Sequence, residues 1–294
     1  MTIDEILAGF RHFQGRYERE CVEEAMARKA EITPHLIRIL EEVAAEPSPF
    51  VEGEETRMDH IYALMLLGNF RESRAHHTII GCFRFSDSLL RDLFGDLVTE
   101  DLPMILVRTC GGTISSLKEV AEDRKLDVFV RLAALHAMSY GVVEGIVSRE
   151  EVIDYYGTLF TGEEDSGSND FWSLLACNVH ELYPEELMET INDAYRHGLI
   201  NPGVISRENF QQSLDAGKEE TLRLHRKSYQ RAQLDDLHRA MSWWACFHEN
   251  EKEAMPELPA GLQMPVSSPK KRDKKKVKRK KKQAKASRRK NRKR

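Results

Sequence analysis

The sequence has no arrangement of cysteines that would form a disulfide framework or a zinc knuckle. Its five cysteines are far apart, stand mostly among apolar residues and include no CxxC pair; they are Cys21, Cys82, Cys110, Cys177 and Cys246. Disulfide-rich domains and structural zinc sites usually need closely spaced cysteines. We therefore expect buried thiols in a reducing compartment, such as the cytoplasm.

The chain also lacks a long hydrophobic run and a secretory leader. No apolar stretch approaches the roughly 18 residues that cross a bilayer as a helix. The first residues, MTIDE, show no basic region followed by an apolar region. We therefore expect neither a membrane span nor secretion. Both expectations favour a cytoplasmic location.

Motifs of catalysis and cofactor binding are missing as well. The patterns HExxH, GxGxxG, GxSxG and the EF-hand loop do not occur. The segment Gly111-Gly112-Thr113 lacks the lysine and the preceding strand of a phosphate-binding loop. We therefore expect a protein without a cofactor and without catalytic activity. The alternatives are an enzyme or metal-binding protein with a site assembled from scattered residues, and a structural assembly factor.

Patterns typical of β-strands are absent, whereas helical signals recur up to about residue 250. Residues 58–70 and 126–140 are apolar almost all round, as expected of helices buried on most sides. Two positions match the capping box that opens a helix, namely Thr2 with Glu5 and Ser148 with Glu151. The sequence therefore predicts an all-α protein.

The apolar helices recur at a loose period. They begin near residues 58, 100, 129 and 170, and a more amphipathic helix follows each after a short turn. Helix pairs with a period of about 30–47 residues are typical of an α-solenoid. Because residues 131–138 are similar to the inner helix of a HEAT-like repeat, we expect a solenoid of HEAT-like helical hairpins over residues 1–250. An irregular helical bundle is the alternative.

Residues 207–249 predict one long C-terminal helix, or two helices joined near Gly217. Leu234, Leu237, Met241 and Trp244 are spaced by three or four residues, so they form one seam along a helix. We expect this helix to cap one end of the stacked hairpins. Trp243, Trp244 and Phe247 could either pack the helix on the stack or form a hot spot for binding.

Several phrases resemble a bacterial family known as domain of unknown function 1186. They are residues 60–75, 93–106, 130–137, 184–188 and 243–247, together with Gly111, Gly112 and Trp172. The resemblance covers roughly residues 1–250 and implies a HEAT-like helical fold, but no activity and no catalytic residues. Some relatives carry a metal-binding knuckle near the C-terminus. This chain has neither Cys nor His after His248, so we expect no such knuckle here.

The composition changes sharply after residue 250. Four prolines and a glycine mark residues 251–269 as a linker. Residues 270–294 then carry a net charge of about +17, which leaves about −21 on the rest of the chain. With almost no apolar residues, this segment is predicted to be a disordered tail rich in Lys and Arg.

The basic tail is the strongest functional signal in the sequence. Lysine-rich arms bind nucleic acids mainly by neutralising phosphates and releasing counterions. RNA, including ribosomal RNA, or DNA is the expected ligand; an acidic protein, an anionic lipid or the chain's own acidic part are alternatives. The predicted polyanion-binding residues are Lys270, Lys271, Arg272, Lys274, Lys275, Lys276, Lys278, Arg279, Lys280, Lys281, Lys282, Lys285, Arg288, Arg289, Lys290, Arg292, Lys293 and Arg294.

Two clusters of potential cation ligands are better explained without a cation. Asp92, Asp96 and Glu100 are spaced by four, but Gly95 and Thr99 predict a helix break between them, so we expect a solvated acidic surface. A second cluster contains His60, His76, His77 and Cys82. Adjacent histidines point about 100° apart on a helix, so we expect them to pack or to face solvent.

These observations together predict a non-catalytic binding or scaffold protein. A groove or acidic surface of the helical repeats is expected to hold a protein partner, while the basic tail tethers the assembly to RNA or the ribosome. The sequence specifies neither the partner nor the oligomeric state.

Overall fold

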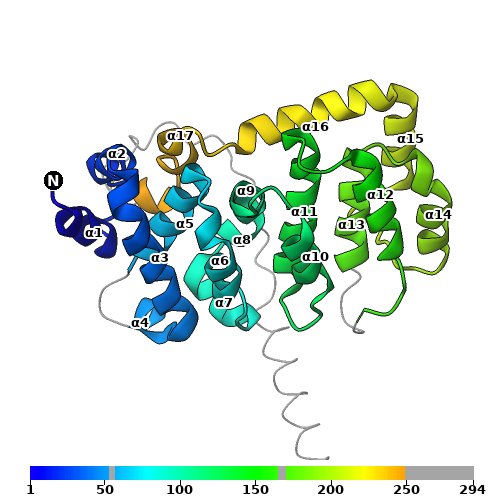
Figure 1. Ribbon diagram of the computed structural model, residues 1–294. Coiled ribbons are helices and arrows are strands. Elements are labelled where there is room, and N and C mark those ends of the chain that lie inside the picture. Colours follow the sequence, from blue (N-terminus) through cyan, green and yellow to red (C-terminus); the bar gives the residue numbers. More distant parts are fainter. Residues whose placement is uncertain (53–56, 165–169, 249–294) are drawn as a thin grey trace, which may run out of the picture. The chain divides into compact units, whose positions relative to one another are not determined.

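The computed structural model describes residues 1–52, 57–164 and 170–248 (Figure 1). Every regular element within these ranges is a helix, which confirms the prediction of an all-α fold. In chain order the helices are α1 (Ile3–Arg11), α2 (Arg19–Ala27), α3 (Lys29–Ala45), α4 (Ser48–Val51), α5 (Asp59–Phe70), η1 (Ser73–Ala75), α6 (His76–Cys82), α7 (Asp87–Phe94), α8 (Leu97–Glu100), α9 (Leu102–Thr109), α10 (Ser115–Glu122), α11 (Val128–Glu144), α12 (Arg149–Thr158), α13 (Asp170–Glu181), η2 (Glu185–Leu187), α14 (Met188–Arg196), α15 (Arg207–Ala216), α16 (Lys218–Ala232), α17 (Leu237–Met241) and η3 (Ala245–His248).

The most apolar helices stack beside one another in chain order. Helix α3 packs on α5, α5 on α9, α9 on α11, and α11 on α13, and Figure 1 shows the same succession from left to right. Nearly every side chain of α5 and most of those of α11 are buried because both helices have neighbours on several sides. This stacking confirms the prediction of an α-solenoid-like arrangement.

The helix starts follow from local sequence chemistry. Thr2 and Glu5 form the expected capping box at α1. The hydroxyl of Ser148 accepts a hydrogen bond from the backbone N–H of Glu151 at 3.1 Å, which satisfies one of the free donors at the start of α12. Both helices therefore begin where the sequence predicts.

Buried arginines join helices that are distant in the sequence. Arg108 of α9 donates to the carbonyls of Gly68 and Asn69 near the end of α5. Arg149 of α12 donates to the carbonyls of Leu182 and Tyr183, which directly follow α13. Carbonyls at helix C-termini have no partner within the helix and carry partial negative charge. Each arginine therefore donates hydrogen bonds to carbonyls at the C-terminal end of a neighbouring helix.

The C-terminal helices do not form the cap that we expected. The chain breaks at Gly217, as one of the two predicted alternatives has it, and Gly217 adopts a φ of 84° that favours glycine. It breaks again after Ala232, because Gln233 is extended and Asp236 caps the N-terminus of α17. The predicted seam contains neither glycine nor proline, so no helix-breaking residue signals this second break.

Instead of capping the stack, this segment runs back along it. We call residues 218–248 the strap; they comprise α16, α17 and η3. Helix α16 packs on α11 and α13, and α17 packs on α5 (Figure 1). Leu234, Leu237 and Met241, three residues of the predicted seam, are fully buried. The expectation of an end cap was wrong because these side chains fit against the inner helices.

The linker and the basic tail predicted for residues 251–294 lie outside the described residues. The described helices all belong to one compact unit, Met1–Asn250. None of them combines the length and the apolar character needed to cross a membrane.

Candidate functional site

A groove of about 1160 Å³ lies between α7–α8 and the strap. One wall is formed by the end of α7 and by α8, the other by residues of α16, α17 and η3, while His136 and Tyr140 of α11 also line it. The two walls come from segments about 140 residues apart in the sequence. The return path of the strap therefore creates the groove.

Four carboxylates line the first wall, namely Asp92, Asp96, Glu100 and Asp101. Gly95 ends α7 with a φ of 51°, so the predicted break is present and the acids do not stack along one helix. They nevertheless reach the same groove. Over residues 1–52, 57–164 and 170–248, no cation or hydrogen-bond donor pairs with any of the four side chains. The expected solvated acidic surface is therefore one wall of a groove.

Asp101 differs from the other three acids because its carboxyl group is largely buried. It precedes α9 without forming a side-chain cap, so no backbone N–H stabilises the charge there. Burial and, to a smaller extent, the neighbouring Glu100 carboxylate raise the pKa of Asp101 to about 7. This carboxyl group therefore changes charge near neutral pH.

The strap wall carries two tryptophans in different environments. Trp243 is 69% exposed, whereas Trp244 is partly buried and stacks on Phe247 with ring centroids 5.9 Å apart. Phe247 is itself buried against Tyr17 and Tyr62. The sequence left two roles open for this cluster, packing and binding. Phe247 packs the strap on the N-terminal helices, whereas Trp243 stays exposed at the groove.

A polar cluster behind the groove links three helices. Glu181 Oε2 of α13 lies 3.6 Å from His136 Nε2 of α11 and 3.2 Å from His225 Nδ1 of α16. The other ring nitrogen of His225 donates to the carbonyl of Ser139 at 2.9 Å. These contacts hold α16 to α11 and α13, and nothing in the sequence spacing indicates them.

Burial disfavours the charged form of both His136 and Glu181, but the neighbouring histidines outweigh this effect at Glu181. Burial lowers the pKa of His136 and so favours the neutral imidazole. Burial also acts against the charge of Glu181, but contacts with His225 and His136 outweigh it and lower the pKa of this carboxyl group. Within the described residues, the buried atoms His136 Nε2, Glu181 Oε2 and His225 Nδ1 have no hydrogen-bond partner of good geometry.

Among the histidines that the sequence places near Cys82, His60 and His76 have structural roles, whereas His77 is exposed. His60 Nε2 donates to the carbonyl of Leu93 at 2.8 Å. His76 bridges Thr109 and Ser116 at 2.9 and 2.8 Å, while the thiol of Cys82 donates to the carbonyl of Leu40. Within the three described stretches, no group of three or more His, Cys, Asp or Glu side chains is arranged to hold a metal ion.

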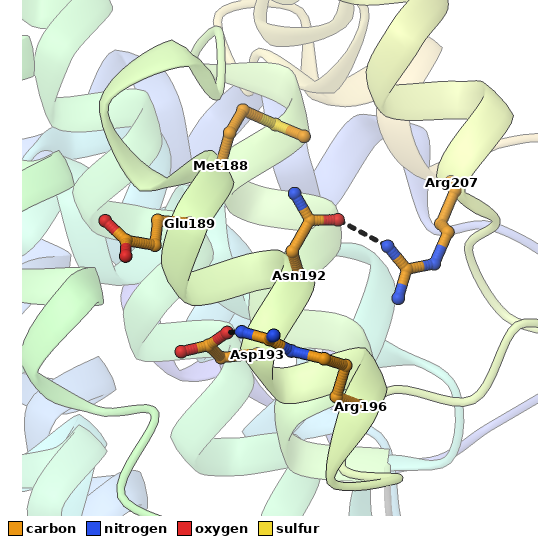
Figure 2. Close-up of a pocket in the computed structure, with 6 residues that line it drawn as sticks. All are labelled: Met188, Glu189, Asn192, Asp193, Arg196 and Arg207. Atoms are coloured by element: carbon orange, nitrogen blue, oxygen red, sulfur yellow. Dashed lines mark hydrogen bonds and ion pairs between the residues drawn. The ribbon is translucent and has the colours of Figure 1, made fainter.

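A second hollow, of about 490 Å³, lies on α14 and α15. Figure 2 shows two pairs among its polar side chains: Arg207 reaches the amide of Asn192, and Arg196 reaches the carboxylate of Asp193. It contains neither an exposed aromatic residue nor a group of uncompensated charges. We therefore place the candidate site in the groove beside the strap.

The predicted polyanion-binding residues, from Lys270 to Arg294, lie outside the described residues. The site that the structure does show was missed by sequence reasoning in most respects. The spacing of Asp92, Asp96 and Glu100 was a signal, and so was the pair of tryptophans. His136 and Asp101 gave none, because their roles depend on how the helices pack.

The fold and groove define an α-solenoid-like protein in which a returning C-terminal strap forms one wall of an open groove and four acidic residues lie on the other wall. The chain belongs to the family described as "Protein of unknown function (DUF1186)", whose family model matches residues 1–248. This match confirms the resemblance found in the sequence.

Two bacterial relatives are similar over most of their length, and both carry the name "Uncharacterized protein". One, from Chlamydia trachomatis serovar D, is 32% identical over 227 residues, which cover 76% of this chain and 90% of the relative. Another, from Chlamydia muridarum, is 33% identical over 211 residues, covering 72% and 84% of the two chains. No solved structure matches the chain.

Proposed function

We propose that this protein is a non-catalytic binding or scaffold protein of the cytoplasm. Its HEAT-like helical hairpins engage a protein partner at the groove, and its basic tail engages RNA, the ribosome or another polyanion. The observation that carries the proposal is the exposed Trp243 on one wall of the groove, opposite four carboxyl groups that have no partner among the described residues.

The groove has the features of a protein-binding surface. Tryptophan is enriched among the residues that contribute most to binding energy at interfaces, and an exposed indole beside a partly buried one offers a ready anchor. Residues of α7, α8, α11 and the strap all line the groove, so one ligand could contact all four. A partner segment lying in it would exclude water from Trp243.

The tail supplies the second part of the proposal. Eighteen basic side chains against one acid give it the charge density needed for binding phosphates. It contains no aromatic residue, so stacking on bases is not expected to contribute. Binding should therefore be insensitive to base sequence and strongly sensitive to salt.

A salt series with RNA tests the role of the tail. The full-length protein and a truncation to residues 1–268 are titrated with a labelled RNA at several salt concentrations. We expect the full-length protein to bind, with an affinity that falls steeply as salt rises, and the truncation to lose most of this affinity. Equal affinity of both proteins would remove the tethering role.

An enzyme with a site assembled from scattered residues is the second candidate function. The observation in its favour is that Asp101 and His136, whose pKa values are shifted in opposite directions, line the same groove. Purified protein can be tested against panels of esters, phosphate esters and glycosides. Turnover that disappears in Asp101→Asn would favour catalysis over binding alone.

A further inference from the structure

Three arginines line the groove together with the four acids, but none of them forms an ion pair with these acids within the described residues. Arg91 lies on the same helix as Asp92, and its guanidinium pairs with Asp87 at 2.6 Å. Arg231 and Arg239 belong to the strap wall, and neither forms an ion pair with these acids in the described part of the chain. The negative charge of this wall is therefore available to a ligand.

The pKa of Asp101 supports this interpretation. A carboxyl group keeps its proton up to neutral pH when burial and a neighbouring carboxylate disfavour its charge and no cation offsets them. A cation entering the groove would lower this pKa and would itself be bound more tightly. The wall thus has the electrostatic character of a cation site without its cation.

The floor of the groove provides an independent observation. His136 lines the groove, and within the described residues its Nε2 has no hydrogen-bond partner. Glu181 Oε2, which does not line the groove, lies 3.6 Å from this nitrogen and 3.2 Å from His225 Nδ1. The imidazole of His136 therefore adds to the groove a polar group that no neighbouring side chain holds at hydrogen-bond distance.

The opposite wall suits the same ligand. An indole ring is the best aromatic partner for a cation, and Trp243 exposes 69% of its surface there. Ala240 and Trp244 of the strap, both partly exposed, also line the groove, and the aliphatic stem of a lysine or arginine packs well on such side chains while its charged end meets polar groups.

We infer that the groove recognises lysine or arginine side chains of a basic segment in a partner protein. This inference rests on the proposed function and names the chemistry of the partner. Nucleic acid suits this site less well, because the exposed carboxylates of Asp92, Asp96 and Glu100 would face its phosphates. The groove and the basic tail would therefore select ligands of opposite charge.

Fluorescence anisotropy with designed peptides tests the inference on the full-length protein. The probes are four fluorescein-labelled peptides that differ only in their central residues, which are lysine, glutamate, glutamine or leucine. We expect the lysine peptide to bind and the others not to bind. Trp243→Ala should weaken this binding about tenfold, and the double variant Asp96→Asn, Glu100→Gln should weaken it several-fold.

Matched controls separate the groove from the rest of the acidic surface. Leu224→Ala removes another exposed apolar side chain of α16, and Glu189→Gln removes an exposed charge beside the second hollow. Both controls should bind the lysine peptide as the unchanged protein does. All substituted side chains are exposed, so the variants should keep their helical circular dichroism spectrum.

The outcomes distinguish the inference from the proposed function. Trp243-dependent binding of the glutamate, glutamine or leucine peptide in place of the lysine peptide would overturn the inference and leave the groove as a binding site. Trp243-dependent binding of RNA, or of a second copy of the chain, would overturn it as well. If no probe binds in a Trp243-dependent manner, both the inference and the role of the groove in the proposed function fail.

Discussion

Leu234 of the strap packs directly against Gly68 of α5. A β-carbon at Gly68 would lie 2.9 Å from Leu234 Cδ1 and 3.1 Å from Ile105 Cγ1, closer than these atoms can normally approach. The next residue, Asn69, donates a side-chain hydrogen bond to the carbonyl of Leu234 at 2.7 Å. Two adjacent residues of an inner helix therefore fix the position at which the strap crosses it.

Gly68→Ala should loosen this crossing. The added methyl group overpacks a site where Leu234 is fully buried, which typically costs about 1–3 kcal/mol and is offset in part by the helix propensity of alanine. We expect a net loss of roughly 1–2 kcal/mol in the free energy of unfolding, measured by chemical denaturation. Hydrogen exchange in α17 should also become faster.

Gly81→Ala is the matched control for this experiment. A β-carbon there would lie 3.7 Å from the β-carbon of Ala44, an ordinary contact. This variant should lose no stability. Equal stability of Gly68→Ala and Gly81→Ala would contradict the close approach of the strap to α5.

Arg149 should contribute strongly to stability because its guanidinium is buried. Its side chain is 4% exposed and pairs with Glu186 at 2.7 Å while it satisfies two carbonyls after α13. Arg149→Leu leaves these acceptors without a donor and should cost about 3–5 kcal/mol in thermal or chemical unfolding.

A surface arginine provides the comparison for Arg149. Arg223 forms an exposed pair with Glu220 on α16, so Arg223→Ala should leave the free energy of unfolding nearly unchanged. If Arg149→Leu lost as little stability as we expect for Arg223→Ala, Arg149 would act only as a surface charge.

Asp101 should make stability depend on pH. Its pKa rises from 3.8 to about 7 on folding, so the native state holds a proton that the unfolded state releases. This carboxyl group therefore destabilises the native state increasingly as pH rises from about 4 to about 7, and the destabilisation is constant at higher pH. Asp101→Asn should be more stable than the unchanged protein by roughly 2–4 kcal/mol at about pH 8, and equally stable near pH 4.

Thermal unfolding across this pH range checks the prediction. Asp92→Asn, which removes an exposed carboxylate of the same wall, is the control and should change the melting temperature little at any pH. A pH-independent difference between Asp101→Asn and the unchanged protein would contradict the raised pKa.

Local sequence patterns were sufficient to predict the helical layers. Residues 58–70 and 126–140 are apolar on all sides, and the structure places α5 and α11 there as inner helices. The path of the strap could not be predicted, since it depends on Gly68 and Leu234 meeting across 166 positions of the sequence. The role of Arg149 could not be predicted for the same reason, because the carbonyls that follow α13 come close to it only in the folded chain.

The site was predictable only where one segment supplies it. The spacing of Asp92, Asp96 and Glu100 suggested an acidic surface, and the structure places all three in the groove. The pair His136 and Glu181 unites two helices, and no motif indicates it. The binding of a polyanion by residues 270–294 stays a prediction.

Hydrogen–deuterium exchange of the full-length protein, with and without the lysine peptide, tests most directly whether the groove is the binding site. We predict slower exchange in α7, α8 and the strap when the peptide is present, and unchanged exchange in α14. Protection confined to α14 and α15, or no protection along either wall of the groove, would contradict the account.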